Sequence, residues 1–416
     1  MHILQELFDS MLQEEFSFNR MGAKLIESKF SDLGTTLTEE QLAEIEEMLE
    51  NIEGGDLTIQ IEDHQLPDSG IALQEVREGV FQMQLDSLDV DEFIQRLREN
   101  IPHLIEGVRS EVSQVILDEL KRDAPQMLKE DRDRRESFEA NTRRLWGKAL
   151  DLLKMSIVIA YETGDDFNEE FRPQPLEEHD HVFDVLTRLH ARACQIASEI
   201  HTLLSAGYAD GAHARWRTLH EISAIGYFVA KHGNAVAERY LCHDAVESYR
   251  AAPQYQEHCE SLGYEQMSDE KMAELKAARD HLVDRFGRGF GNQYGWASDA
   301  LRMDDPNFSD IERDVNLEHL RPFYKLASHN VHANPKGVLF KLGLLPGSEN
   351  LLLAGPSNAG LADPGHLTAI SLAQITTLLL TTRPNIDRLV ICDILMKLEQ
   401  ETGDAFLAAH KALEQQ

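Results

Sequence analysis

Apolar residues recur every three or four positions through most of the chain, which is the spacing of one face of an amphipathic α-helix. We therefore predict an all-α protein. At most a small β-hairpin, or else a long loop, is expected between residues 337 and 360. The helices expected in the C-terminal half span residues 182–207, 208–233, 235–252, 269–287, 316–333, 365–382 and 386–413.

The first part of the chain has the same periodicity with more charge. Residues 36–55 predict a helix that has Thr38 as its N-cap and ends at Gly54 and Gly55. The alternating apolar residues 57, 59 and 61 favour one short strand. Helical spacing returns from Val90 to about Glu162, and Pro102 marks either a kink or a restart in it.

The densest basic stretch lies within this second helical segment. Acidic residues are interspersed with its arginines, which favours a solvated helix face with ion pairs between residues three or four apart. A docking strip for RNA or for an acidic partner is the alternative. The arginines concerned are Arg132, Arg134, Arg135, Arg143 and Arg144.

The periodicity stops in a stretch that is rich in acids and contains two prolines. We predict an acidic helical N-terminal region at 1–162, a linker at 163–181 and a helical-bundle domain at 182–416. His179 and His181 lie two residues apart beside acidic residues, but this spacing chelates a metal only in a strand or a bent loop. We expect an exposed linker, and we predict neither a metal nor a cofactor.

The formal net charge of −33, from 73 acidic and 40 basic residues, is typical of a self-repelling soluble protein. RNA or nucleotide binding would need a local basic patch, whereas the acidic N-terminal region suits a basic protein partner. The four cysteines show no CxxC spacing, so we expect free thiols in a reducing compartment. The segment 366–382 is too short and too polar for a membrane span, so we expect a cytoplasmic protein without membrane contact. We also expect a homo-oligomer.

Charged residues on two apolar helices are candidates for chemistry. Arg217 and Glu221 lie four residues apart in the helix 208–233, so they share a face, and they must be paired if they are buried. Arg239 and His243 have the same spacing in the next helix, with Glu247 one turn later. Both sets are compatible with a packing network as well as with a site.

A third set lies in the stretch 324–337, which reads YKLASHNVHANPKG. In a helix Tyr324, Ser328 and His332 would form a polar stripe beside an apolar one, as in the lining of a cleft between helices. His329 falls outside this stripe and is expected to be exposed. Asn334 and Pro335 should end the helix.

Arginines can hold an anion, and histidines can transfer protons near pH 7. These groups together suit cleavage of RNA without a metal: a base removes the 2′-hydroxyl proton, an acid protonates the leaving oxygen, and arginine balances the phosphate charge. They also suit binding of a nucleotide or an acidic peptide without reaction.

The order of these motifs resembles a bacterial family of helical proteins, family 5677 of domains of unknown function, over residues ~183–344. The resemblance rests on RTLHEISAIGYF, AERYLCHDAVESY, YGWAS and LRPFYKLASHNVHANPKG. The helical layout is also similar to the HEPN group of helical-bundle ribonucleases and nucleotide-binding modules, many of which act in toxin–antitoxin and antiphage systems. That group has an Arg, then four to six intervening residues, then a His, on one helix. Arg215 and His220 fit this spacing, although the group places the motif on a late helix.

The resemblance implies a HEPN-like ribonuclease, hence a hydrolase and nuclease, or an RNA-binding effector in stress or phage defence. His332 and His243 would be the acid/base groups, and Arg217 and Arg239 the phosphate contacts. Glu221 would orient Arg217, while Tyr324 and Ser328 would supply hydrogen bonds. The alternative is a non-enzymatic acidic helical interaction or regulatory protein, in which the Arg/Glu/His network is structural.

Overall fold

The computed structural model describes residues 17–32, 36–50, 87–172, 180–345, 347 and 350–415. Every regular element in these ranges is a helix, so the predicted all-α fold is confirmed. The chain forms two compact units, Met1–Met127 and Leu128–Gln416, which are described separately below. The strand expected at residues 57–61 and the residues just before it lie outside the described ranges.

In the first unit, helices α2 (Phe18–Asp32) and α3 (Glu39–Glu50) pack against each other. Their small core contains Ala23, Ile26, Phe30 and Ile45. Thr38 caps α3 as predicted, because its hydroxyl accepts a hydrogen bond from the Gln41 amide at 3.3 Å. The Gln41 side chain in turn accepts one from the Thr38 amide at 2.9 Å, which completes a reciprocal cap.

Helix α4 (Ser87–Phe171) is 85 residues long and continues from the first unit into the second. Pro102 and Pro125 lie inside it, so Pro102 does not separate two helices. The helix also includes residues 163–171, which the sequence placed in the linker. On its exposed surface Arg135 pairs with Glu139 at 3.0 Å, as expected for a solvated face with charge pairs four residues apart.

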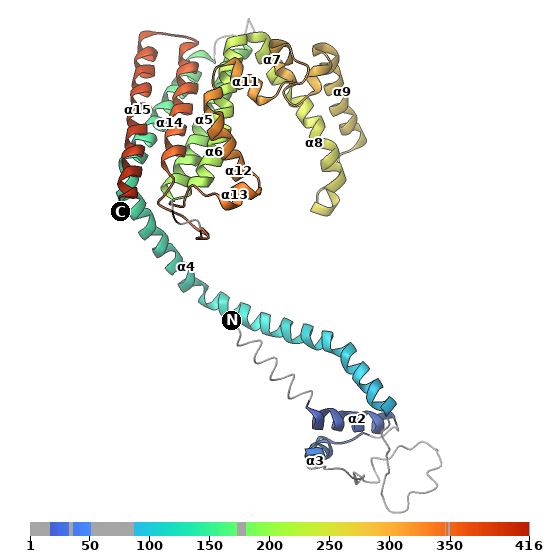
Figure 1. Ribbon diagram of the computed structural model, residues 1–416. Coiled ribbons are helices and arrows are strands. Elements are labelled where there is room, and N and C mark those ends of the chain that lie inside the picture. Colours follow the sequence, from blue (N-terminus) through green and yellow to red (C-terminus); the bar gives the residue numbers. More distant parts are fainter. Residues whose placement is uncertain are drawn as a thin grey trace, which may run out of the picture. The chain divides into compact units, whose positions relative to one another are not determined.

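The second unit is a helical bundle built around α6 (Ala209–His232). This helix packs against α5 (His181–Ser205), α12 (Arg321–Val331) and α14 (Ala362–Thr381), and α15 (Ile386–Glu414) covers α14 (Figure 1). The indole of Trp216 ties α6 to α14, because its Nε1 donates to the Leu367 carbonyl at 2.9 Å. The C-terminal part of α4 joins this core through Trp146, whose ring lies 6.0 Å from that of Phe406.

The remaining elements connect α6 to α14. Helix α7 (Asn234–Cys242) is separated from α8 (Asp244–His258) by His243, whereas the sequence indicated one continuous helix. Helix α9 (Asp269–Phe286) packs beside α8 (Figure 1). Short helices follow: η2 (Glu260–Leu262) before α9, then η3 (Arg288–Gly291), η4 (Gly295–Ala297), α10 (Ser298–Leu301), α11 (Phe308–Asp314), η5 (Glu318–Leu320) and α13 (Pro335–Leu339).

The described part of the segment 337–360 contains the end of α13 and irregular backbone, so it is a loop rather than a hairpin. Helix α14, which contains the most apolar stretch of the sequence, is buried through Leu367, Leu372 and Leu379. Among the described helices, none is both long enough and apolar enough to cross a membrane.

Candidate functional site

The clearest polar cluster lies where α6 meets α12. The Tyr324 hydroxyl donates to Glu221 Oε1 at 2.5 Å, and Arg217 Nε lies 3.2 Å from the same carboxylate oxygen. The Arg217 guanidinium also stacks on the Tyr324 ring, 4.8 Å from its centroid. Burial and the Glu221 carboxylate raise the pKa of Tyr324, so the phenol remains protonated and acts as a donor. Three of the predicted site residues therefore lie together.

A chain of polar groups, which sequence reasoning missed, lies behind this cluster and runs from the buried His220 and Glu312 to the partly exposed Arg321. His220 Nε2 lies 2.8 Å from Glu312 Oε1, and both side chains are fully buried. The other Glu312 oxygen accepts from Arg321, whose guanidinium lies 5.2 Å from the Tyr324 ring. A carboxylate only accepts hydrogen bonds, so His220 Nε2 carries a proton. Tyr324 thus lies between the Glu221–Arg217 pair and the Glu312–Arg321 pair.

Arg239 of α7 and His243, which follows α7, lie at a different place. Both contact residues 287–298, which we call the loop 287–298. The Arg239 side chain is buried and donates to the carbonyls of Trp296, Gly295 and Phe286 at 3.1, 3.3 and 3.4 Å. It also donates to the Ser298 hydroxyl at 3.1 Å. Its guanidinium therefore binds the backbone of the loop, and burial lowers the pKa of Arg239.

His243 holds the same loop from one turn further along the chain. Its Nε2 lies 2.9 Å from the Asn292 carbonyl oxygen, which can only accept, so this nitrogen carries the hydrogen. Burial lowers the pKa of His243 and favours the neutral ring. The ring also meets Phe290 edge to face, with centroids 5.2 Å apart. All of these contacts position the loop.

The C-terminal end of α12 differs from the predicted stripe. The helix ends at Val331, so His332 is an exposed cap residue with extended backbone and does not continue the line of Tyr324 and Ser328. The reason lies in the next residues: Asn334 caps α13 by accepting from the Gly337 amide at 2.9 Å, which requires a turn before it. The Ser328 hydroxyl donates back to the Tyr324 carbonyl at 2.8 Å. His329, which was expected to be exposed, is half-buried, and its Nδ1 accepts a hydrogen bond from the side-chain amide of Asn334.

The Arg215 and His220 pair, which fits the HEPN spacing, does not form one site. The Arg215 guanidinium pairs with Glu199 on α5, whereas His220 pairs with Glu312 on α11. The two side chains are thus directed at different elements. This divergence follows from their separation of about 140° around the helix.

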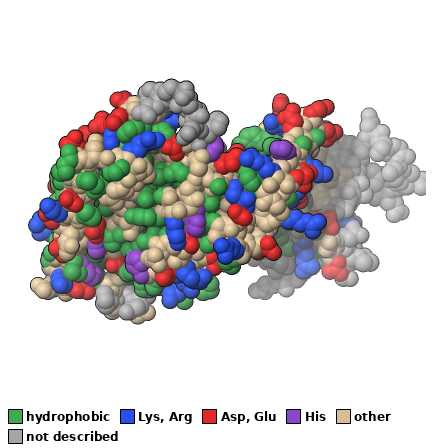
Figure 2. Space-filling view, turned by 90° about the horizontal axis from the view of Figure 1, so that it is seen from above, with side chains coloured by type: hydrophobic (Ala, Val, Ile, Leu, Met, Phe, Trp, Pro, Cys, Tyr) green, Lys and Arg blue, Asp and Glu red, His purple; other side chains and the backbone are tan. Residues whose placement is uncertain are grey.

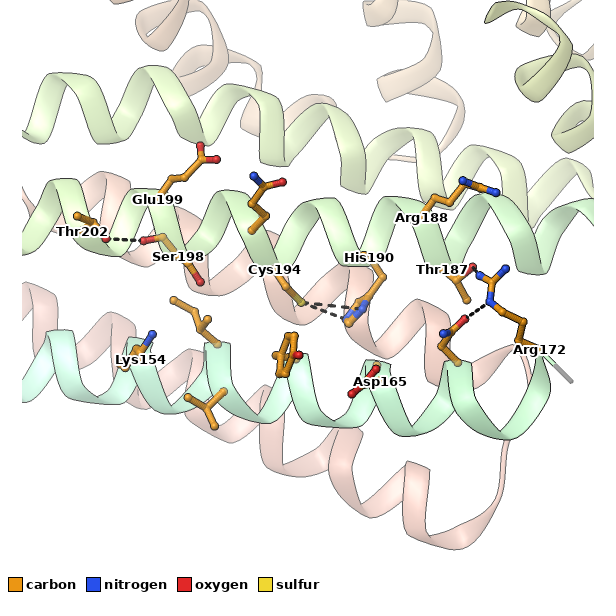
Figure 3. A pocket seen from close by; sticks show the side chains of 17 residues that line it. Lys154, Asp165, Arg172, Thr187, Arg188, His190, Cys194, Ser198, Glu199 and Thr202 are labelled. Carbon is orange, nitrogen blue, oxygen red and sulfur yellow. Dashed lines mark hydrogen bonds between the residues drawn. The ribbon is translucent and has the colours of Figure 1, made fainter.

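A groove between α4 and α5 is a second candidate site (Figure 3). It has a volume of about 790 Å³, which is within the range of ligand pockets. Its wall combines Ile157, Val158 and Tyr161 of α4 with His190 and Cys194 of α5. Arg172 lies at one end and hydrogen-bonds to Asn168 at 2.7 Å. None of the residues predicted as a site lines this groove.

His190 and Cys194 at the wall of the groove are neutral and unreactive side chains. His190 Nε2 lies 3.1 Å from the Thr376 hydroxyl, which itself donates to the Leu372 carbonyl, so the imidazole nitrogen donates. Burial lowers the pKa of His190 to about 4 and raises the pKa of Cys194 to about 12. Both side chains are neutral at pH 7, and the thiol is not an activated nucleophile. Within the described residues no three His, Cys, Asp or Glu side chains are arranged to hold a metal ion.

Comparison with known families gives one match. Residues 183–346 match the model of a family of unknown function (DUF5677), which confirms the predicted resemblance. This range is less than half of the chain; it includes both the Tyr324 cluster and the loop held by Arg239, but not α4, α14 or α15. No curated protein and no solved structure shows significant similarity to the chain.

Proposed function

We propose that this chain is a non-enzymatic helical interaction protein, and that its Arg/Glu/His groups form a structural network. The observation that carries the proposal is the bonding of Arg239, which was expected to contact phosphate. Its guanidinium donates to three backbone carbonyls and one hydroxyl of the protein itself. A guanidinium has five N–H donors in a fixed fork, so little capacity remains for a ligand.

The other expected catalytic groups support the same proposal. His243 is bonded to the loop backbone, and Arg217 is matched by the Glu221 carboxylate. His332 is exposed beyond the end of α12, outside the contacts that join the rest of the cluster. On the face seen in Figure 2, basic side chains lie in small groups among acidic ones, whereas a phosphate backbone is best bound by a continuous basic surface.

Paired measurements of stability and activity test the proposal. Residues of a structural network stabilise the fold, whereas catalytic groups are often neutral or unfavourable for stability. We expect Arg239→Met and Glu221→Gln each to lower the free energy of unfolding by at least about 1 kcal/mol. The wild type should leave total RNA intact in EDTA. Cleavage by the wild type that is lost in a fully stable Arg217→Ala or His332→Ala protein would overturn the proposal.

The second candidate is a metal-independent ribonuclease or RNA-binding effector, as the HEPN resemblance implies. One observation favours it: the side chains of Arg217 and Arg321, which both approach the Tyr324 ring, remain 26% and 30% exposed. Two cations beside an aromatic ring are a plausible contact for a phosphate and a base. Binding of a labelled RNA oligonucleotide that weakens steeply with salt, and that Arg217→Ala and Arg321→Ala both reduce, would support this candidate.

A further inference from the structure

The segment that follows α12 is an exposed apolar surface. Val338 and Leu339 of α13 are 63% and 81% exposed, and Phe340 beside them is 44% exposed. Leu351 and Leu352 are 64% and 97% exposed in the loop that follows. Large apolar side chains that gather on a surface commonly mark an interaction site. We call the consecutive exposed residues Val338, Leu339 and Phe340 the α13 patch.

The packing of α13 explains why these side chains face outward. Gly337 is buried, and a Cβ atom there would lie 2.0 Å from the His329 carbonyl oxygen. Residue 337 therefore packs tightly on the end of α12, and Val338 and Leu339 are directed away from it. The residues after α13 are tied to α6, because the Leu342 amide donates to Asp210 Oδ1 at 3.0 Å. The α13 patch is thus held on a supported backbone.

The residues that flank the patch in sequence are basic, although the chain as a whole is acidic and Asp210 of α6 accepts a hydrogen bond from the nearby Leu342 amide at 3.0 Å. Residues 319–348 contain no acidic residue, although the chain has 73 of them, and they include Arg321, Lys325, Lys336 and Lys341. Lys336 and Lys341 lie directly beside the apolar residues in sequence. An apolar centre with a basic rim is complementary to a partner that carries apolar and acidic side chains.

We propose that the α13 patch is the docking surface for an acidic amphipathic helix of a protein partner. The apolar face of that helix would cover Val338, Leu339 and Phe340, and its carboxylates would meet Lys336 and Lys341. Docking of an amphipathic helix through apolar anchors is a common mode of peptide recognition. This inference rests on the proposed interaction function and names the surface and the chemistry of the partner. RNA is the less suitable occupant, because the two most exposed side chains of the patch, Val338 and Leu339, are aliphatic and offer a base no stacking surface, and Phe340 is less exposed than either.

A labelled peptide with the sequence of residues 36–55 provides a suitable probe. It has seven glutamates, no basic residue, and apolar residues at helical spacing. We expect its fluorescence anisotropy to rise with added full-length protein. The affinity should fall about tenfold or more in Leu339→Glu, which removes the most exposed apolar side chain of the patch. It should fall by a similar factor in the double variant Lys336→Glu/Lys341→Glu, which reverses the charge of the two flanking lysines. Leu262→Glu, at a leucine that is 66% exposed on η2, is the matched control and should bind normally.

The same titration separates the possible failures. A peptide with all seven glutamates replaced by lysine should not bind, and equal binding of both peptides would overturn the inference. Equal binding by the wild type and the patch variants, or no binding by any of them, would also overturn it, while leaving the proposed interaction function intact. Cleavage of an RNA oligonucleotide in a parallel arm would instead overturn the proposed function. Circular dichroism of each variant establishes that a loss of binding is not a loss of fold.

Discussion

The Tyr324 hydroxyl donates to Glu221 Oε1 at 2.5 Å and thereby joins α12 to α6. The Glu221 carboxylate also forms an ion pair with Arg217, whose Nε lies 3.2 Å away but has no hydrogen-bond partner among the described residues. Tyr324→Phe removes the hydrogen bond but keeps the ring that Arg217 and Arg321 approach. We expect it to lower the free energy of unfolding by about 1–3 kcal/mol in a urea titration, since the lost bond is made to a charged group.

A double-mutant cycle isolates this contact from other effects of the substitutions. Tyr324→Phe and Glu221→Leu should together lower the free energy of unfolding by less than the sum of the two single changes, because each of them removes the same hydrogen bond. Strict additivity of the two free energies would show that the hydrogen bond contributes nothing measurable to stability.

Arg239 should be required for order in the loop 287–298. Its side chain is 7% exposed and donates to the carbonyls of Gly295 and Trp296. Both carbonyls would lose this donor in Arg239→Met, although that of Gly295 still accepts from the Ser298 hydroxyl at 2.7 Å. We expect about 2–4 kcal/mol less stability and faster amide hydrogen exchange in this loop. Arg288→Ala, an exposed arginine of the same loop, should change neither. A stable Arg239→Met protein with unaltered exchange would contradict the structural role of this arginine.

The periodicity of apolar residues was sufficient to predict the long helices of the bundle and the burial of α6, but not the break between α7 and α8 or the short helices α10, α11 and α13. It also predicted that Arg217 and Glu221 would pair, because residues four apart in a helix are neighbours. Such local relationships depend only on the geometry of one element. For the same reason Thr38 could be predicted as an N-cap from the sequence, although its reciprocal partner Gln41 was not predicted.

Contacts between distant segments could not be predicted in the same way. The partner of His220 is Glu312, 92 residues later, and Arg239 bonds to carbonyls 56 and 57 residues away. These pairs depend on where the loop and α11 fold back onto the bundle, and no local pattern encodes that position. The break at His332 was missed because Asn334 acts as the N-cap of a new helix rather than simply as the end of the old one.

Two buried histidines should make the protein less stable in mild acid. Burial lowers the pKa of His190 and of His213 to about 4, from an ordinary value of 6.5. Below pH 6.5 the unfolded chain therefore binds protons that the folded chain does not. The free energy of unfolding keeps its full value above pH 6.5 and falls as the pH approaches 4. Each histidine should lower the free energy of unfolding by about 2 kcal/mol when the pH is reduced from 7.5 to 5.

His213→Leu separates this effect from that of the carboxylates. Neither ring nitrogen of His213 has a hydrogen-bond partner among the described residues, so the substitution should cost little at pH 7.5. The difference in unfolding free energy between pH 7.5 and pH 5 should then shrink by about 2 kcal/mol. His258→Gln, at an exposed histidine, should leave that difference unchanged. An identical pH dependence in His213→Leu would contradict the assignment.

Thiol reactivity should distinguish Cys242 from the other three cysteines. Cys194, Cys259 and Cys392 are buried, whereas Cys242 is half-buried. Burial raises the pKa of Cys194 to about 12, which leaves almost no thiolate at pH 8. We expect the native protein to release one equivalent of thionitrobenzoate rapidly from Ellman's reagent, and four equivalents after unfolding in guanidinium. Cys242→Ser should abolish the rapid phase, and persistence of that phase would mean that a buried thiol is accessible.

Two glycines of α4 should respond in opposite directions to the same substitution. A Cβ on Gly164 would lie 2.3 Å from the His190 ring, whereas a Cβ on Gly107 would meet nothing within 4 Å. Gly164→Ala must therefore displace α5 or rotate a buried imidazole, and we expect it to lower the free energy of unfolding by about 1–3 kcal/mol. Gly107→Ala should raise local helix stability by about 0.5–1 kcal/mol, because alanine restricts the unfolded chain and favours the helix. The first effect is measured by urea unfolding of the Gly164 variant and the second by amide exchange around residue 107. Stabilisation by both substitutions would contradict the close approach of α4 and α5 at His190.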